Sequence, residues 1–197
     1  MMMAANRLFI FLHGVGDSAA GMRGFANHFA AQFPDVAIEV PDGTLPMGPH
    51  GGRQWFPIQG VTEENRPSRV AEGLPAVVSL IKAAQAKYQV AAKDTVLIGF
   101  SQGTIMSLAT VVAHPELVGA VIGFSGRFAE LPSSISTETK IHLLHGEADP
   151  VMPVMLAKQA YAQLQSLGAS VTLDTEPGVA HHIGAGLFQK AIGYLTV

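Results

Sequence analysis

A serine at the centre of a Gly-x-Ser-x-Gly pattern is the strongest chemical signal in this sequence. Residues 99–103 read Gly-Phe-Ser-Gln-Gly, after the apolar run 95–98 and before a helix-like segment from Gln102 to Ala113. A sharp turn between a strand and a helix exposes the Ser101 hydroxyl, and glycines on both sides avoid collisions at that turn. Amide groups at the start of the helix favour a developing oxyanion. The pattern therefore predicts a nucleophilic serine.

An activated serine needs a base, and an acid that orients the base. Residues 145–151 read His-Gly-Glu-Ala-Asp-Pro-Val and follow a later apolar run. We select Asp149 as the acid, because Glu147 lies two residues earlier and would tend to face the other way. Taken alone, Asp149 is more simply interpreted as a solvated residue that starts a turn before proline. Its position downstream of Ser101 favours the catalytic interpretation.

Two adjacent histidines, His181 and His182, follow the last predicted strand and compete for the role of general base. Either imidazole can transfer a proton near neutral pH. The chemistry of the residues alone leaves the choice open. The remaining histidines lack a catalytic context and are too scattered for a metal site, so we expect neither a metal nor a cofactor.

The first predicted strand ends in a glycine-rich turn, residues 13–17, which read His-Gly-Val-Gly-Asp. An oxyanion hole needs two converging N–H donors. We expect the amide of Gln102 to be one and the amide of Val15 to be the other. The alternative is a turn that only caps the next helix.

Three further residues are candidates for substrate contact. Trp55 and Phe56 lie in a long irregular segment, residues 41–67, and Met152 follows Asp149. Long loops in compact domains are often functional, and aromatic side chains line many ligand pockets. Burial of the two aromatic residues as a loop anchor is about equally plausible, and a methionine is more often part of a core.

Apolar runs alternate with helical patterns along the whole chain. This alternation predicts a parallel sheet with helices on both faces and ligands at the carboxyl ends of the strands. We expect one domain spanning residues 1–197. The expected strands are 8–12, 36–40, 95–100, 118–124, 141–144 and 171–173, and the expected helices are 18–33, 68–88 with a kink or a later start at Pro75, 102–113, 155–167 and 187–195.

Composition excludes several classes of protein. The 197 residues are 48% hydrophobic and 14% charged, with a formal net charge of −3 and no cysteine. Disulfides and thiolate metal sites are therefore excluded, and no basic surface for nucleic acid is expected. No apolar run is long enough to span a membrane, and residues 1–7 lack the layout of a signal peptide, so we expect a cytoplasmic protein.

Taken together, these motifs resemble the phospholipase/carboxylesterase family, which includes acyl-protein thioesterases, and within it the small bacterial esterases. The resemblance implies a minimal α/β-hydrolase fold with about six mostly parallel strands and no lid domain. It also implies a Ser101–Asp149–His181 triad that works without a cofactor. The matching segments are residues 11–17, 54–56, 98–103, 145–151 and 178–181, and segments 52–56 and 60–66 match the bacterial branch.

Two departures from the thioesterases bear on the substrate. Pro57 stands where they usually have aspartate, and Thr104 stands where they have a further glycine. We therefore predict a carboxylesterase that hydrolyses small or short-chain esters. The alternatives are a thioesterase or lysophospholipase with the same triad, and a non-catalytic binding protein on a hydrolase scaffold.

The start of the chain bears on assembly. Only about six residues precede the first expected strand, too few for the leading antiparallel strands of the family. Strand 36–40 is then expected at an open edge of the sheet, and open edges pair readily. We expect a homodimer or a capping loop there.

Overall fold

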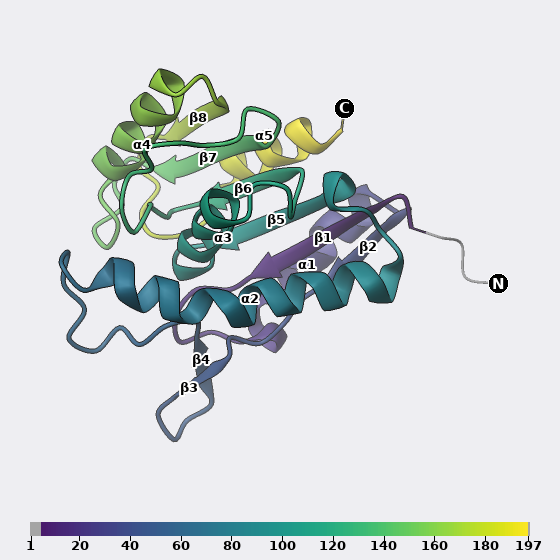
Figure 1. Ribbon diagram of the computed structural model, residues 1–197, viewed down its shortest axis with the longest axis horizontal. Helices are drawn as coiled ribbons and strands as arrows, with labels where there is room; N and C mark the ends of the chain where they lie inside the picture. Colours follow the sequence, from purple (N-terminus) through teal and green to yellow (C-terminus); the bar gives the residue numbers. More distant parts are fainter. Residues whose placement is uncertain (1–4, 197) are drawn as a thin grey trace.

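A parallel sheet of six strands forms the centre of the protein (Figure 1). The computed structural model describes residues 5–196. Residues 1–4 and residue 197 lie outside this range, and so does the beginning of segment 1–7, which we expect not to be a signal peptide. The strand order is β2-β1-β5-β6-β7-β8. The strands are β1 (Arg7–Leu12), β2 (Val36–Glu39), β5 (Thr95–Phe100), β6 (Ala120–Phe124), β7 (Lys140–Gly146) and β8 (Ser170–Glu176). This architecture confirms the predicted α/β-hydrolase fold class.

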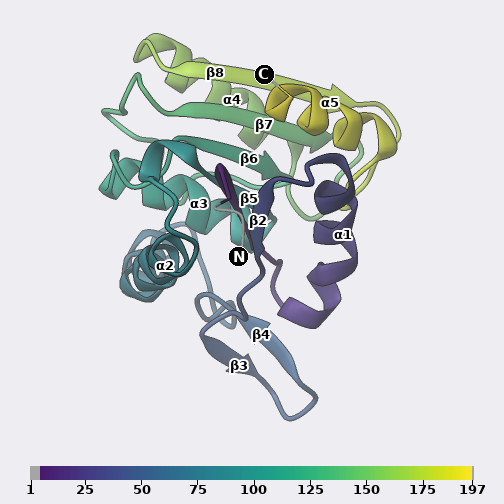
Figure 2. The same ribbon diagram turned by 90° about the vertical axis from the view of Figure 1, so that its right-hand side faces the viewer.

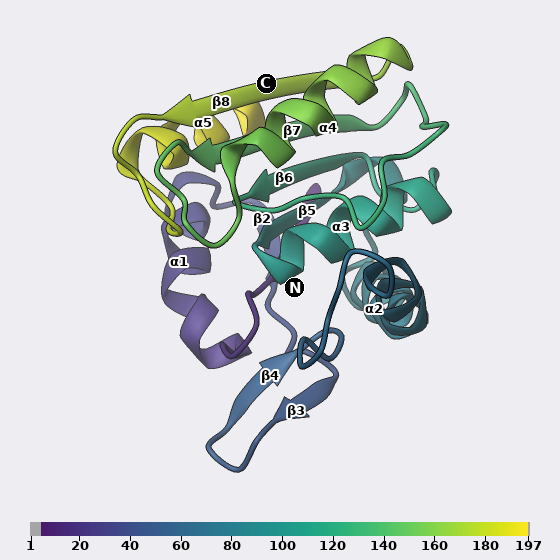
Figure 3. The ribbon, with the colours of Figure 1, turned by 90° about the vertical axis from the view of Figure 1, so that its left-hand side faces the viewer.

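Helices cover both faces of the sheet, as Figures 2 and 3 show. Each face has its own apolar core, so the central strands are buried on both sides and read as continuous apolar runs. One face carries α1 (Ala19–Gln32) and α5 (Ala185–Leu195), and the other carries α2 (Arg66–Tyr88), α3 (Gln102–Ala113) and α4 (Val154–Ser166).

The long segment before α2 contains structure that the sequence pattern missed. Strands β3 (Leu45–Met47) and β4 (Gly52–Gln54) form a short antiparallel hairpin that projects away from the main sheet (Figure 1). Three-residue strands with proline and glycine in them have no clear period, which is why the segment reads as irregular. Helix α2 begins at Arg66, earlier than expected, and runs through Pro75 to Tyr88.

Strand β2 lies at the edge of the sheet, as predicted. It is only four residues long and pairs with β1 on one side. The Tyr88 hydroxyl at the end of α2 donates a hydrogen bond of 3.2 Å to the carbonyl of Ile38, so a side chain from α2 satisfies one acceptor of this strand. A short edge strand with side-chain partners is a weak template for further pairing.

Helix α3 approaches β1 so closely that only glycine fits at its second residue. A Cβ added to Gly103 would lie 1.8 Å from the Leu12 carbonyl oxygen and 2.9 Å from that of His13. A Cβ added to Gly99 would lie 2.6 Å from the amide nitrogen of Thr104. These collisions are the reason for both glycines of the pattern, as the sequence predicted in general terms.

We expect Gly103→Ala to destabilise the fold by about 3 kcal/mol or more, because the backbone of β1 has to move to admit the methyl group. Gly24→Ala in α1 is the control, since a Cβ there meets no atom within 4 Å. That change should stabilise the protein by up to about 1 kcal/mol through helix propensity. Urea unfolding of the two variants measures both effects, and equal stabilities would contradict the close approach.

Candidate active site

The carboxyl ends of three strands bring together the serine, acid and histidine singled out in the sequence. Ser101 follows β5, Asp149 follows β7 and His181 follows β8. The Ser101 Oγ lies 3.0 Å from His181 Nε2, and His181 Nδ1 lies 2.7 Å from Asp149 Oδ2. The three side chains form one continuous chain of hydrogen bonds, although up to 80 residues separate its members in sequence.

Ser101 sits in a strained backbone conformation, with φ at 53° and ψ at −115°. Such a conformation costs on the order of 1–3 kcal/mol and persists only where the surroundings hold it. The Phe124 carbonyl at the end of β6 accepts the Ser101 amide at 3.0 Å and the Thr104 hydroxyl at 2.8 Å. Thr104 therefore takes part in holding the turn.

Two glycines make room for Thr104, the residue that departs from the thioesterase pattern. A Cβ on Gly126 would lie 2.3 Å from the Thr104 Cβ, and one on Gly123 would lie 2.8 Å from its methyl group. The space that a smaller residue at this position would leave is thus filled by threonine, and the loop after β6 packs directly on it.

Asp149 is buried and held as a carboxylate. Burial opposes its ionisation, but the Met152 amide, the His181 ring and the Val151 amide all donate to it, and together they lower its pKa below the ordinary value. The Met152 and Val151 amides lie 2.8 Å and 2.9 Å from Oδ1. Oδ2 is thereby left to accept a hydrogen bond from His181 Nδ1. This bond keeps the ring proton on Nδ1, so Nε2 is an acceptor that faces the Ser101 hydroxyl.

His145 supports the loop that carries Asp149. Its ring is almost fully buried, and Nε2 lies 2.6 Å from the Met152 carbonyl and 3.6 Å from Asp149 Oδ2. Burial lowers the pKa of His145, so the neutral ring donates its Nε2 proton to Met152. These contacts make His145 a structural residue of this loop.

The other candidates for base and acid point elsewhere. His182 is exposed, with no side-chain hydrogen bond to the described residues. Glu147 accepts the Thr175 hydroxyl at 2.7 Å, away from the histidine. The structure therefore brings His181 and Asp149 to Ser101, and leaves His182 and Glu147 outside the chain of hydrogen bonds.

The two residues whose amides are expected to stabilise an oxyanion line the same cavity as Ser101. Gln102 begins α3, and Val15, Gln102 and Ser101 all line one cavity. Neither amide donates a hydrogen bond to another residue within 5–196. Two free donors on residues that line the cavity of a strained serine are suited to an oxyanion site.

The segment between β2 and α2 holds the glycine-rich turn in place. Arg53 of β4 exchanges two backbone hydrogen bonds of 2.8 Å with Gly16 and Asp17. The Trp55 indole donates to the His13 carbonyl at 2.9 Å, and the His13 ring accepts the Gly43 amide at 2.8 Å. The turn that carries Val15 is therefore fastened to the rest of the fold by its neighbours on both sides.

The side chain of Gln102 adds a bridge that the sequence interpretation missed, because only its amide was considered. Its carbonyl oxygen accepts the Trp55 amide at 2.5 Å, and its amide nitrogen donates to the Phe56 carbonyl at 2.9 Å. The residue that follows the serine thus ties the aromatic segment to the start of α3.

The predicted substrate residues divide between anchor and cavity. Phe56 and Met152 line a cavity of about 620 Å³ together with Ser101. Trp55 has no exposed surface and is not among the lining residues. It therefore serves as a loop anchor and does not line the pocket. Three charged residues also line this cavity and were not anticipated: Glu63, Arg66 and Arg127. In the sequence, only the position of Arg127 soon after the expected strand 118–124 pointed to a place near the site.

Two features of the described residues concern metal ions and membranes. Residues 5–196 contain no group of three or more histidines, cysteines and acids arranged to hold a metal ion. Over the same residues, no helix combines the length and apolarity needed to cross a bilayer.

Comparison with known proteins gives a family from the sequence and similar esterases from both sequence and structure. The phospholipase/carboxylesterase family matches residues 2–197. Esterase YpfH of Escherichia coli is 42% identical over 97% of this chain and 82% of its own length, and acyl-protein thioesterase 1 of Debaryomyces hansenii is 30% identical over 97% and 90%. The crystal structure of esterase PE8 superposes with a TM-score of 0.88 at 28% identity, covering 98% of this chain and 92% of that one.

The lowered pKa of Asp149 predicts a pH-dependent contribution to stability. A carboxyl group whose pKa is lower in the folded state stabilises the fold above its ordinary pKa of 3.8, and this contribution is lost as the pH falls below that value. The free energy of unfolding of the wild type should therefore fall more steeply from about pH 5 to about pH 3 than that of Asp149→Asn. Urea unfolding measures the slopes. The exposed Asp35→Asn should keep the wild-type slope, and identical slopes for all three proteins would contradict the prediction.

Proposed function

Because the chain belongs to the phospholipase/carboxylesterase family, we propose that it is a serine carboxylesterase that acts through Ser101, His181 and Asp149. The observation that carries this proposal is the unbroken series of hydrogen bonds from the Ser101 hydroxyl through His181 to Asp149. The Val15 and Gln102 amides, which donate to no other described residue and belong to residues lining the same cavity as Ser101, support it.

The proposed reaction proceeds in two halves. His181 Nε2 takes the hydroxyl proton as Ser101 Oγ attacks the ester carbonyl, and Asp149 stabilises the imidazolium that forms. The amides of Val15 and Gln102 bind the oxyanion. The alcohol leaves with the proton from His181, which produces an acyl-serine. Water then attacks the acyl group with His181 as base, releasing the acid and restoring the serine.

The short connection after β6 supports an open site that accepts small soluble esters. The connection from β6 to β7, residues 125–139, contains no helix or strand and is too short for a lid domain. A thioesterase is the second candidate, because the Debaryomyces hansenii relative is an acyl-protein thioesterase. A homodimer through the β2 edge and a cytoplasmic location stay predictions.

We expect Ser101→Ala to reduce the hydrolysis of p-nitrophenyl acetate by at least about 10⁴-fold, because no other group replaces the nucleophile. Ser79→Ala, an exposed serine of α2, is the matched control and should retain full activity. A fluorophosphonate probe should label the wild type and not Ser101→Ala. Full turnover by that variant would refute the assignment, and an unlabelled wild type would favour a binding protein.

His181→Ala and His182→Ala form a second matched pair. Loss of His181 should lower kcat by several orders of magnitude, because the serine then keeps its proton. Loss of the exposed His182 should change kcat by less than about threefold, in line with its position outside the chain of hydrogen bonds. Steady-state kinetics on p-nitrophenyl butyrate decides between them, and the reverse order of effects would make His182 the base.

A chain-length series separates the two candidate activities. Acetate to palmitate esters and the corresponding thioesters are compared by kcat/KM at equal enzyme concentration. We expect a maximum at short oxygen esters, because the chain departs from the thioesterase pattern at Pro57 and Thr104. A maximum at long thioesters would favour the thioesterase.

A further inference from the structure

The cavity beside Ser101 combines an apolar wall with one cluster of charge. Phe56, Ile58, Ile105 and Leu156 are among its apolar lining residues. Of the lining residues, only Glu63, Arg66 and Arg127 are charged, so the cavity carries one unbalanced positive charge. The proposed mechanism uses none of these three side chains.

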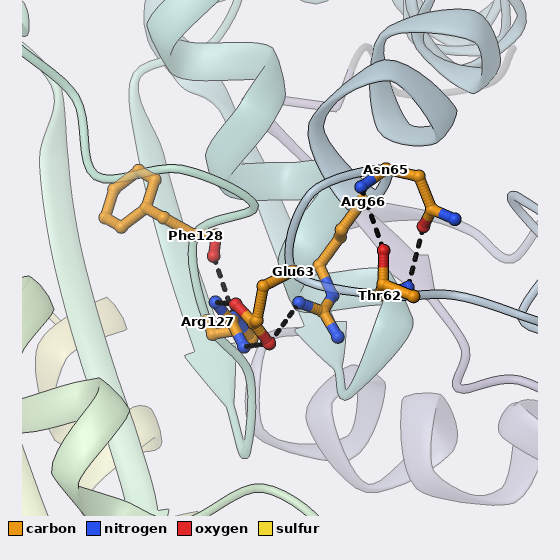
Figure 4. A network of polar contacts seen from close by, with 6 residues as sticks. All are labelled: Thr62, Glu63, Asn65, Arg66, Arg127 and Phe128. Carbon is orange, nitrogen blue, oxygen red and sulfur yellow. Dashed lines mark hydrogen bonds and ion pairs between the residues drawn. The ribbon is translucent and has the colours of Figure 1, made fainter.

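The two guanidinium groups converge on a single carboxylate (Figure 4). Arg127 binds Glu63 through two parallel hydrogen bonds of 2.9 Å and 2.8 Å, one to each carboxylate oxygen. Arg66 donates a third hydrogen bond of 2.6 Å to Glu63 Oε1. A planar pair of N–H groups facing a carboxylate edge is the geometry by which arginine recognises carboxylates in general.

Burial places the cations on the inside and the anion on the outside. The side chains of Arg66 and Arg127 are 15% and 14% exposed, whereas that of Glu63 is 70% exposed. The hydrogen bonds from Arg127 and then Arg66 lower the pKa of Glu63 to about 2, so the carboxylate is ionised at neutral pH. Glu63 therefore caps two sheltered guanidinium groups from the solvent side.

Hydrogen bonds to the backbone orient Arg127 and fix the turn that carries Glu63. Arg127 Nε donates to the Phe128 carbonyl at 3.0 Å, which orients its guanidinium independently of Glu63. Thr62 and Asn65 exchange hydrogen bonds of 2.7 Å and 3.2 Å across the turn that carries Glu63 (Figure 4). Because the Glu63 side chain is 70% exposed and an incoming carboxylate would accept the same charge-assisted hydrogen bonds, one carboxylate can replace the other with little net change in free energy.

We propose that Arg66 and Arg127 form a carboxylate-binding subsite of the active-site cavity, and that Glu63 occupies it until a substrate carboxylate takes its place. The preferred substrates are then esters that carry a carboxylate at the far end of their acyl or alcohol chain, with the apolar wall contacting the methylene groups between. This inference rests on the proposed function, because it assigns a substrate class to the same site.

The test compares charged esters with neutral ones of the same shape. Monoethyl esters of the dicarboxylic acids from succinate to suberate are paired with the ω-amides of the same length, and ethanol release is followed. A second set, ω-acetoxy carboxylates paired with ω-acetoxy amides, places the charge on the alcohol side. We expect kcat/KM of the best carboxylate to exceed that of its amide by about tenfold or more, chiefly through a lower KM.

Three variants distinguish recognition from a merely structural role. Arg127→Gln should lower the carboxylate-to-amide ratio by about tenfold, because one bidentate partner is lost. Glu63→Gln should raise that ratio, since the competing carboxylate is gone. Arg23→Gln, an exposed arginine of α1 that does not line the cavity, is the matched control and should leave the ratio unchanged.

The outcomes separate this inference from the proposed function. If the wild type hydrolyses the amides and its carboxylate-to-amide ratio of kcat/KM is near one at every chain length in both sets, the subsite alone is overturned. If Arg127→Gln and Glu63→Gln both lower kcat/KM equally for carboxylates and amides, the cluster only fastens two loops together. That result also overturns the subsite. If neither series is hydrolysed, the proposed function is wrong and the subsite falls with it.

Discussion

The strained backbone of Ser101 is the constraint on which the rest of the structure depends. A residue with φ at 53° between a strand and a helix is stable only because the Phe124 carbonyl holds its amide and glycines at 99 and 103 remove side chains from the crossing. That requirement brings β1, β5, β6 and α3 into close contact. The same contact places the start of α3 and the turn after β1 on the same cavity.

The segment between β2 and α2 supplies the support that the turn after β1 lacks. Residues 13–17 form no regular element, and the oxyanion role proposed for the Val15 amide requires a rigid turn. Backbone hydrogen bonds to Arg53, the indole of Trp55 and the side chain of Gln102 provide that rigidity. The aromatic segment thus contributes to the site mainly by positioning, with Phe56 alone of the two aromatic residues reaching the cavity.

Much of the fold and the site could be predicted, because both follow from local patterns. The apolar runs located all six strands of the sheet, and alternation with helices made that sheet parallel. The order of Ser101, Asp149 and the histidine pair followed from strand ends that meet at one edge. The β3–β4 hairpin and the arginine cluster were missed, since short strands have no period and Glu63 meets Arg127 across 64 residues of chain.

The sequence by itself determined the fold class, the nucleophile pattern and a short set of partners for it, because glycine placement and hydrophobic period act over a few neighbouring residues. The chemistry of the residues left His181 and His182 open, the family resemblance favoured His181, and the tertiary structure placed the His181 ring beside Ser101. Only the tertiary structure decided between pocket and anchor for Trp55. These choices depend on which way a loop turns after its strand ends. That direction is set by hydrogen bonds to distant residues, such as the one between His181 and Asp149, which adjacent positions in the sequence do not encode.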